Sequence, residues 1–481
     1  MKTQIKRLGL FALLSVSGLS GCKKELTNNT DTGNFKRPAT ALFPDVHPLP
    51  SLTDTISGVI TSNITLTNDK TWFINGPTFV SNNAVITIQP GTYIKGIPQT
   101  QSTNNYPSYL IICKGSKIDA QGTTVNPIVF TSAKPAGQRG RGDWGGLALL
   151  GNAPVNQTSP QIAGVPAYQI PATLSGSDPI GYGGSVENDN SGTLKNVRIE
   201  FAGVIIDPAT DNVLNGFTLA GVGAGTTIDH VQVSYSAADG FAFFGGSVNL
   251  KYIIAYGSDD DDIDFDLGYQ GSIQFGLTAR NANVLSSIST NPNGIESNNF
   301  TPPKYTGTGG AFAGRTTQPV LSNISVTGLA SGAGTLGTGN LFRVNSSYKI
   351  RNSVVMGYNT GCNLSSAAGT EYASSFVHGY ITAGVSSPSV TLLTGANPNG
   401  VIKLVDPFNV TTPDWRFRIS PPPVSPLANV ANFTGFVVSH PGGSLLTFDN
   451  SITYLGAFGS QTTPRWDAGG WASYEPFTNA Y

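Results

Sequence analysis

One stretch of the chain, residues 225–271, contains the same pattern twice, and this repeat limits the possible folds more than any other feature. The apolar pattern that starts at Ile228 (Ile-x-x-Val-x-Val) returns 22 residues later at Leu250 as Leu-x-x-Ile-x-Ala. The segment that follows, from Phe241, returns at the same interval from Ile263. Two strand-like segments that repeat together at such a period are typical of a solenoid of stacked coils.

Alternation within these segments predicts which side chains point inward. Phe241 and Phe243 are separated by one small residue, and the 22-residue register places them over Ile263 and Phe265. Because side chains alternate along a strand, these four residues are expected to form one inward column, with coils about 4.8 Å apart. The predicted fold is therefore all-β, a right-handed, single-stranded parallel β-helix.

The same pattern predicts further coils on both sides of the repeat. It occurs 34 residues earlier, from Leu194, and the extra length points to a loop inserted over residues 207–215. Later rungs are expected at 273–277, 321–326 and 350–355.

Composition agrees with a β structure that is rich in turns. The chain has 58 Gly and 31 Pro among 481 residues, and only 11% of its residues are charged. The net charge of −1 gives no electrostatic basis for binding nucleic acid. Cys113 and Cys362 lie about eleven coils apart in this scheme, too far for a disulfide, and are predicted to be buried thiols.

The N-terminus has the features of an export signal. Basic residues precede a short apolar segment, Leu8–Val16, which is too short to span a bilayer. The peptide Leu19-Ser-Gly-Cys22 resembles the lipobox of bacterial lipoproteins, a likeness that implies cleavage before Cys22 and lipid attachment to it. Residues 1–21 are thus predicted to be a lipoprotein signal peptide, and the membrane a partner through the lipid.

Three further regions follow from composition and periodicity. Residues 22–55 are rich in Thr, Asn and Pro and predict a lipidated, flexible tether. Residues 56–408 carry the strand patterns of the β-helix. Residues 409–481 lose the period and predict a C-terminal cap, because an open coil exposes apolar side chains and strand edges.

Three peptides together resemble a family of uncharacterised Bacteroidetes cell-surface proteins. They are Arg139–Val155, Gly225–Gly271 and Tyr454–Gly459. The resemblance implies a right-handed β-helix on the cell surface and no settled activity. With the lipobox, it places the protein in the outer membrane, lipid-anchored and facing outward.

The acidic run after Ser258 is the strongest candidate site. Dense carboxylates repel one another unless protons or a cation neutralise them, and oxygen-rich surroundings favour Ca²⁺. Two alternatives are a solvated acidic turn and a catalytic acid pair. The predicted metal ligands are Asp239, Asp259, Asp261, Asp262, Asp264 and Asp266.

Other side chains are expected on the outer face of the coils, where they could contact a ligand or simply stack on one another. These candidate ligand-binding residues are Arg198, Glu200, His230, Tyr252, Tyr256 and Glu296.

The function predicted from these features is non-enzymatic binding of a glycan or another surface polymer, with stabilisation by Ca²⁺. One alternative is a polysaccharide lyase or glycoside hydrolase of the β-helix type, and a second is a structural spacer of the envelope. The tripeptide Arg141-Gly-Asp143 also suggests adhesion, as a weaker hypothesis.

Overall fold

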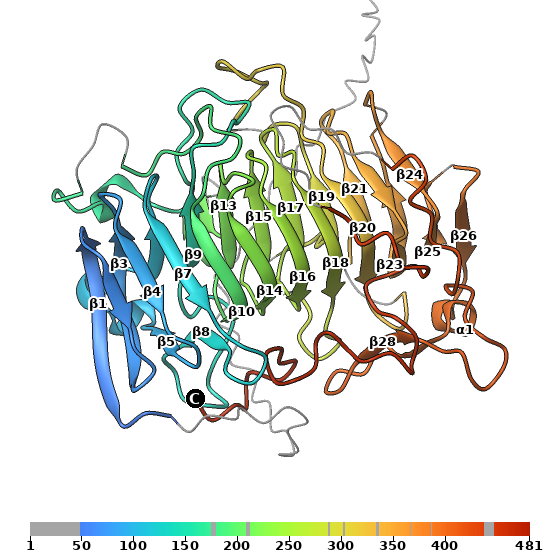
Figure 1. The fold of residues 1–481 in the computed structure, drawn as a ribbon, viewed down its shortest axis with the longest axis horizontal. Helices are drawn as coiled ribbons and strands as arrows, with labels where there is room; N and C mark the ends of the chain where they lie inside the picture. The colour runs from blue at the N-terminus through green and yellow to red at the C-terminus, as the bar shows by residue number, and fades with distance from the viewer. Residues whose placement is uncertain are drawn as a thin grey trace, which may run out of the picture.

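The computed structural model describes residues 49–481 except 175–178, 208–211, 287–288, 302–303, 333–335, 366, 386 and 437–446. The predicted signal peptide, Cys22 and most of the predicted tether lie outside the described residues. Within the described residues, 24 strands form one sheet that winds into a right-handed parallel β-helix (Figure 1). The predicted fold class is confirmed.

The strands of this sheet follow one another along the chain. The first ten are β1 Leu52–Ile60, β2 Ile64–Leu66, β3 Lys70–Val80, β4 Val85–Ile88, β5 Tyr93–Gly96, β6 Tyr109–Ile112, β7 Lys117–Gln121, β8 Ile128–Ser132, β9 Gly146–Leu150 and β10 Gly192–Glu200. The next seven are β13 Phe217–Ala220, β14 Thr227–Ser234, β15 Phe241–Phe244, β16 Asn249–Tyr256, β17 Ile263–Asp266, β18 Ser272–Ala279 and β19 Ile295–Ser297. The last seven are β20 Val320–Thr327, β21 Thr338–Phe342, β22 Lys349–Arg351, β23 Val354–Asn363, β24 Glu371–Ala373, β25 Ser375–Thr382 and β26 Val390–Thr394.

A few elements lie outside this sheet. Two antiparallel pairs are formed by β11 Val204–Asp207 with β12 Asn212–Leu214, and by β27 Leu404–Asp406 with β28 Asp414–Phe417. The helical elements are short: η1 Gln99–Gln101, η2 Thr103–Asn105, η3 Ala167–Gln169 and α1 Pro398–Ile402. No helix among the described residues is long and apolar enough to cross a membrane.

The predicted register is confirmed where the repeat is clearest. β14 pairs with β16 so that Ile228 lies beside Leu250, and β15 pairs with β17 so that Phe243 lies beside Phe265. The earlier 34-residue interval is confirmed by the pairing of Leu194 with Ile228. The residues inserted in that coil include the β11–β12 hairpin.

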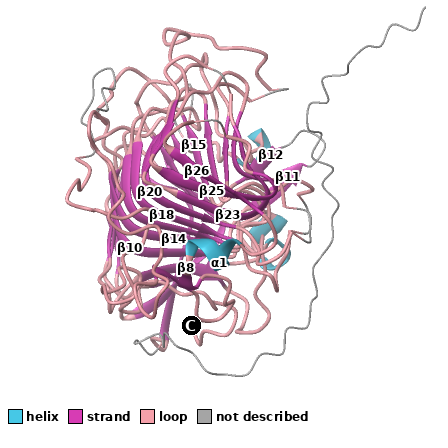
Figure 2. Ribbon diagram, turned by 90° about the vertical axis from the view of Figure 1, so that its right-hand side faces the viewer, coloured by secondary structure: helices cyan, strands magenta, loops and turns pink. Residues whose placement is uncertain are grey.

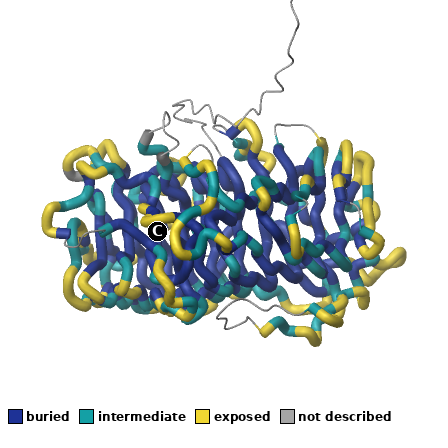
Figure 3. The backbone as a smooth tube through the Cα atoms, turned by 90° about the horizontal axis from the view of Figure 1, so that it is seen from above, coloured by how far each residue is buried: buried dark blue, intermediate teal, exposed yellow. Residues whose placement is uncertain are grey.

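The inward column forms as predicted. Phe241, Phe243, Ile263 and Phe265 are at most 1% exposed and belong to one core that runs through the solenoid. The rings of Phe243 and Phe265 stack with their centroids 4.9 Å apart. Figure 3 shows buried backbone along the whole body and exposed residues mainly at the turns.

Leu267 departs from simple alternation. Continued alternation would point it inward with Ile263 and Phe265, but it packs in a different cluster with residues such as Val155 and Ile162. Its φ of +55° turns the chain at the end of β17, so alternation along the strand no longer holds.

A bend recurs inside the long strands β10, β14, β16, β18 and β20. The bend residues all have positive φ; they are Asn196, His230, Tyr252, Phe275, Asn323 and, in the next coil, Asn352. Asparagine adopts this conformation at low cost. In the middle coils the bend residues are aromatic, and their rings stack on one another, with 4.5 Å between the ring centroids of His230 and Tyr252. The bend explains why two residues separate the first and second inward side chains of the repeated pattern, whereas one residue separates the second and third.

The segment after α1 returns along one flank of the solenoid (Figures 1 and 2). Backbone amides in this segment donate hydrogen bonds to residues of several coils. Asn432 donates to Asn352 (2.8 Å), Asp449 to Gln274 (2.8 Å) and Ser473 to Gln232 (2.8 Å). The region predicted as a cap therefore covers a flank of the β-helix with these contacts. We call residues 447–481 the flank segment.

Candidate metal centre on the outer face

Three carboxylates meet where two adjacent turns stack. Asp239 lies in the turn before β15, and Asp260 and Asp261 lie in the turn before β17, one coil further on. One oxygen from each residue lies within 4.8 Å of the others. The backbone amide of Asp261 donates to Asp239 Oδ1 at 3.1 Å, as the 22-residue register of the two turns requires.

Asp264 and Glu296 continue the acidic surface along the strands. The two residues are direct partners in the pairing of β17 with β19. Asp264 is 8% exposed, and its Oδ1 has no hydrogen-bond partner. Burial raises the pKa of Asp264 well above its usual range, and the nearby carboxylates of Asp266, Asp239, Glu296 and Asp261 raise it further.

Asp266, at the end of β17, is held by loop residues. It accepts hydrogen bonds from the Asn298 amide (3.1 Å) and from the Thr301 hydroxyl (2.5 Å). Burial nevertheless raises its pKa to about 7, because these two donors offset only part of the desolvation.

Asn293 connects Asp261, in the turn before β17, with Glu296 on β19. Its side-chain amide donates to Asp261 Oδ1 and to Glu296 Oε2, both at 3.0 Å, and its backbone amide donates to Asp261 Oδ1 at 2.7 Å. Glu296 also forms an ion pair with Arg343. We call Asp239, Asp260, Asp261 and Asp264 the acidic cluster.

Two predicted metal ligands form ion pairs instead. Asp259 contacts the partly buried Arg141 (2.8 Å), and Asp262 contacts the buried Arg280 (3.3 Å). The prediction for Asp259 and Asp262 is corrected in this respect, because each carboxylate is already neutralised by an arginine. Burial still raises the pKa of Asp262 to about 7, with Arg280 opposing the shift.

The geometry of the acidic cluster fits a hard cation. Ca²⁺ binds six to eight oxygens at about 2.4 Å, so two oxygens on the same ion lie at most about 4.8 Å apart. The Asp239, Asp260 and Asp261 oxygens meet this limit, and all three ligand atoms are carboxylate oxygens. Asp264 supplies a buried acceptor that lacks a hydrogen-bond donor.

The predicted ligand-binding residues on the opposite flank are covered. Arg198 and Glu200 form an ion pair with each other (3.0 Å), and both are 1% exposed. The Tyr481 hydroxyl donates to both Glu200 oxygens, at 2.6 and 2.5 Å, while Tyr256 is buried and its hydroxyl donates to Val410. These side chains point away from the interior, but the expectation that they are open to a ligand is wrong.

His230 and Tyr252 are only partly exposed. The two rings stack on each other, and both also contact the Trp466 ring, at 6.2 and 5.4 Å between centroids. Trp466 belongs to the flank segment. His230 and Tyr252 therefore stack on one another, which is the second of the two possibilities that the sequence left open for these side chains.

The tripeptide 141–143 is likewise engaged inside the protein. Arg141 donates to Asp259 and to the Gly257 carbonyl, and Asp143 accepts from Lys134 and Ser132, both at 2.6 Å. This geometry argues against adhesion through an exposed tripeptide.

Sequence reasoning missed Asp260 as a cluster member and Arg141, Arg280 and Asn293 as its neighbours. Asp260 lies in a turn, where strand alternation does not assign a direction. Asn293 and Arg280 lie in coils with long loops, so the period of the sequence does not predict which residues of the neighbouring coils they meet. The positions of Arg141 and Asp259 could not be related without the fold, since 118 residues separate them.

An all-β solenoid with a cluster of acids on its outer face defines the class of this protein: a parallel β-helix with a candidate cation site. The chain belongs to the family of pectate-lyase-like β-helix domains, which it matches over residues 58–391. No curated protein matches it.

Two solved structures are similar to this chain at low identity. A pectate lyase, Pel9A, shares 13% identity with a TM-score of 0.37, over 86% of this chain and 87% of that one. The Dettilon tailspike protein shares 12% identity with a TM-score of 0.27, over 73% of this chain and 63% of that one.

Proposed function

We propose that this protein is a Ca²⁺-binding β-helix that binds an acidic polysaccharide or a similar surface polymer without cleaving it. The observation that carries the proposal is Asp264, a buried carboxylate without a hydrogen-bond donor on Oδ1, next to the gathered oxygens of Asp239, Asp260 and Asp261. Such an arrangement is costly unless a cation or protons neutralise it.

Asp239, Asp260, Asp261 and Asp264 would hold the ion, and Asn293 and Glu296 would position Asp261 and close one side of the site. A bound Ca²⁺ would supply positive charge to a surface that otherwise repels anions. An acidic polymer would therefore bind only when the ion is present, through its own carboxylates.

The surroundings favour binding over cleavage. A lyase needs a base beside the sugar that the metal binds. Arg280 and Arg343, the arginines that contact Asp262 and Glu296, each form an ion pair with a carboxylate. A guanidinium group is in general a poor base. Burial lowers the pKa of Arg280, but Asp262 and the other nearby groups outweigh this effect and raise the pKa above its ordinary value.

We also propose that the protein is a lipoprotein of the outer membrane, held at the cell surface through Cys22. This part rests on the N-terminal sequence, which lies outside the described residues.

The test is a binding assay with polygalacturonate and with a neutral glucan, in Ca²⁺ and in EDTA. We expect Ca²⁺-dependent binding of the acidic polymer, lost in Asp264→Asn and retained in Asp69→Asn, a control at an exposed turn. Absorbance at 235 nm should stay flat, because no unsaturated uronate is formed. Product release that disappears in Asp264→Asn would establish the lyase alternative instead, and absence of binding in Ca²⁺ would contradict the proposal.

A further inference from the structure

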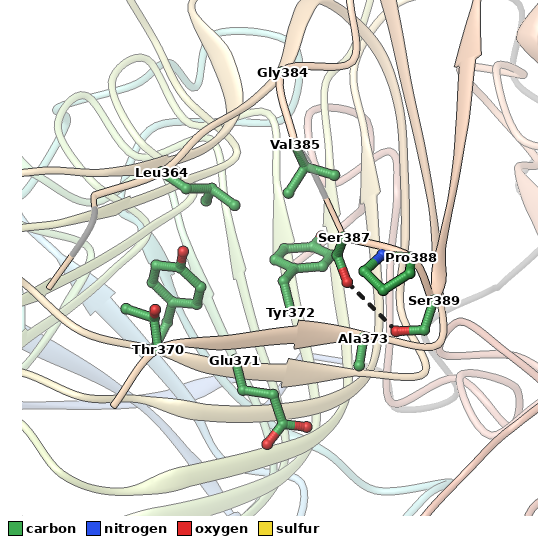
Figure 4. A pocket seen from close by; sticks show the side chains of 11 residues that line it. Leu364, Thr370, Glu371, Tyr372, Ala373, Gly384, Val385, Ser387, Pro388 and Ser389 are labelled. Atoms are coloured by element: carbon green, nitrogen blue, oxygen red, sulfur yellow. Dashed lines mark hydrogen bonds between the residues drawn. The ribbon is translucent and has the colours of Figure 1, made fainter. Parts of the chain in front are cut away.

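A cavity of about 570 Å³ opens near the last coils of the β-helix, away from the acidic cluster. It is lined by Tyr348, Leu364, Thr370, Glu371, Tyr372, Ala373, Gly384, Val385, Ser387, Pro388 and Ser389 (Figure 4). Its volume lies within the range of about 300–1,000 Å³ that is typical of small-molecule sites.

The cavity has a structural origin. Each coil normally covers the inward side chains of the coil before it. The ladder of β20, β22 and β24 ends at β24 among the described strands. The inward residue of β24, Tyr372, therefore has open space beside it, which Val385 and Leu364 border.

Aromatic and aliphatic side chains form part of the cavity wall, although most of the exposed lining is polar. The Tyr348 and Tyr372 rings lie 6.4 Å apart between centroids, and both tyrosines are only 6% exposed. Their hydroxyls are fixed, because Tyr348 donates to the Ser365 carbonyl (3.3 Å) and Tyr372 accepts from Asn340 (3.0 Å). The cavity therefore has walls that are already in place.

The rim is polar but carries no charge that faces inward. Ser387 and Ser389 lie at the mouth with their hydroxyls 3.5 Å apart, and Thr370 lies across from them. Glu371 forms an ion pair with Arg351, and Figure 4 shows its carboxylate directed away from Tyr372 and Val385. The cavity thus offers hydroxyl groups and ring faces without a net charge.

We infer that this cavity is a binding site for an uncharged pyranose residue, whose apolar face would pack against the tyrosine walls and whose hydroxyls would bond to the rim. A negatively charged ligand fits worse, since the lining residues include no cationic side chain that would neutralise it. The site is independent of the acidic cluster and of the function proposed for it.

The experiment measures binding of methyl glucoside, methyl galactoside and methyl mannoside by saturation-transfer NMR and calorimetry, with methyl glucuronide as the charged counterpart. EDTA is present throughout, so that the acidic cluster does not contribute. We expect at least one neutral glycoside to bind with a Kd of about 1–10 mM, because a single small ring makes few contacts. The glucuronide should bind more weakly.

Variants place the binding in the cavity. Val385→Trp should abolish it by filling the space, and Thr370→Val should weaken it by removing one hydroxyl at constant shape. Thr391→Val makes the same change on the exposed face of β26 and should bind as wild type does. The circular dichroism and melting temperature of each variant show that it is folded.

Three results would overturn the inference: no binding of any neutral glycoside, equal or tighter binding of the glucuronide, or undiminished binding by a folded Val385→Trp protein. Concentration-dependent association of the wild type that Val385→Trp removes, without glycoside binding, would show instead that a second copy fills the cavity.

Discussion

Asp264 and its neighbours Asp262 and Asp266 have different chemical surroundings although they alternate along one short strand. Asp262 contacts Arg280, Asp266 accepts from Asn298 and Thr301, and Asp264 Oδ1 lacks a donor. The sequence showed that this segment is unusually acidic. It could not show which carboxylate is neutralised, because the partners come from other coils.

Stability without a bound metal should depend on pH through these acids. Burial raises the pKa of Asp262 and of Asp266 from 3.8 to about 7, so the folded state binds their protons more tightly than the unfolded state. Their contribution to stability is complete below about pH 4 and is lost as the pH rises through about 7. In EDTA we expect Asp266→Asn to reduce the fall in melting temperature between pH 5 and pH 8. An unchanged slope, equal to that of Asp69→Asn, would contradict the assignment.

A second residue-scale prediction concerns the core. Phe265 is fully buried between Phe243 and Tyr269, so Phe265→Ala leaves a cavity. We expect a loss of about 3–5 kcal/mol in the free energy of unfolding, measured by denaturant titration. Phe244→Ala, at a partly exposed position of the neighbouring strand, is the control and should cost less. Equal stability of Phe265→Ala and wild type would show that the register is off by one residue.

At the scale of the elements, the 22-residue repeat was enough to pair β14 with β16 and β15 with β17 correctly. Strand pairing in a solenoid is local in sequence, so its period can be seen in one chain. The flank segment has no such period. Ser473 bonds to Gln232 across 241 residues, and no pattern in the sequence relates the two. This is why residues such as Arg198 and Tyr256 were expected to be exposed.

The flank segment should stabilise the coils that it covers. The Tyr481 hydroxyl donates to the buried Glu200 carboxylate, and its ring stacks on Tyr93 with 5.2 Å between centroids. Tyr481→Phe keeps the ring and removes the donor, so we expect a loss of about 1.5–3 kcal/mol in the free energy of unfolding. The matched control is Tyr168→Phe, where the residue is 67% exposed. If both variants unfold alike, the contact with Glu200 contributes nothing to stability.

At the scale of the whole molecule, the proposed lipid anchor at Cys22 can be tested separately from the β-helix. Because Cys22 follows a short apolar segment in a lipobox-like peptide, Cys22→Ser should release the protein from the membrane fraction. Fractionation followed by immunoblotting measures this, with Cys113→Ser as the control at a buried position in the β-helix. Retention of Cys22→Ser in the membrane pellet, with normal processing, would contradict lipid anchoring.

The most direct test of the central claim is the melting temperature of the purified protein as Ca²⁺ is added. An ion that binds only the folded state stabilises it by mass action, so the melting temperature should rise with Ca²⁺ and return to its starting value in EDTA. Asp261→Asn and Asp264→Asn should remove most of the rise, and Asp69→Asn should retain it. A melting temperature that does not respond to Ca²⁺, or a rise that persists in both cluster variants, would contradict a cation site at the acidic cluster.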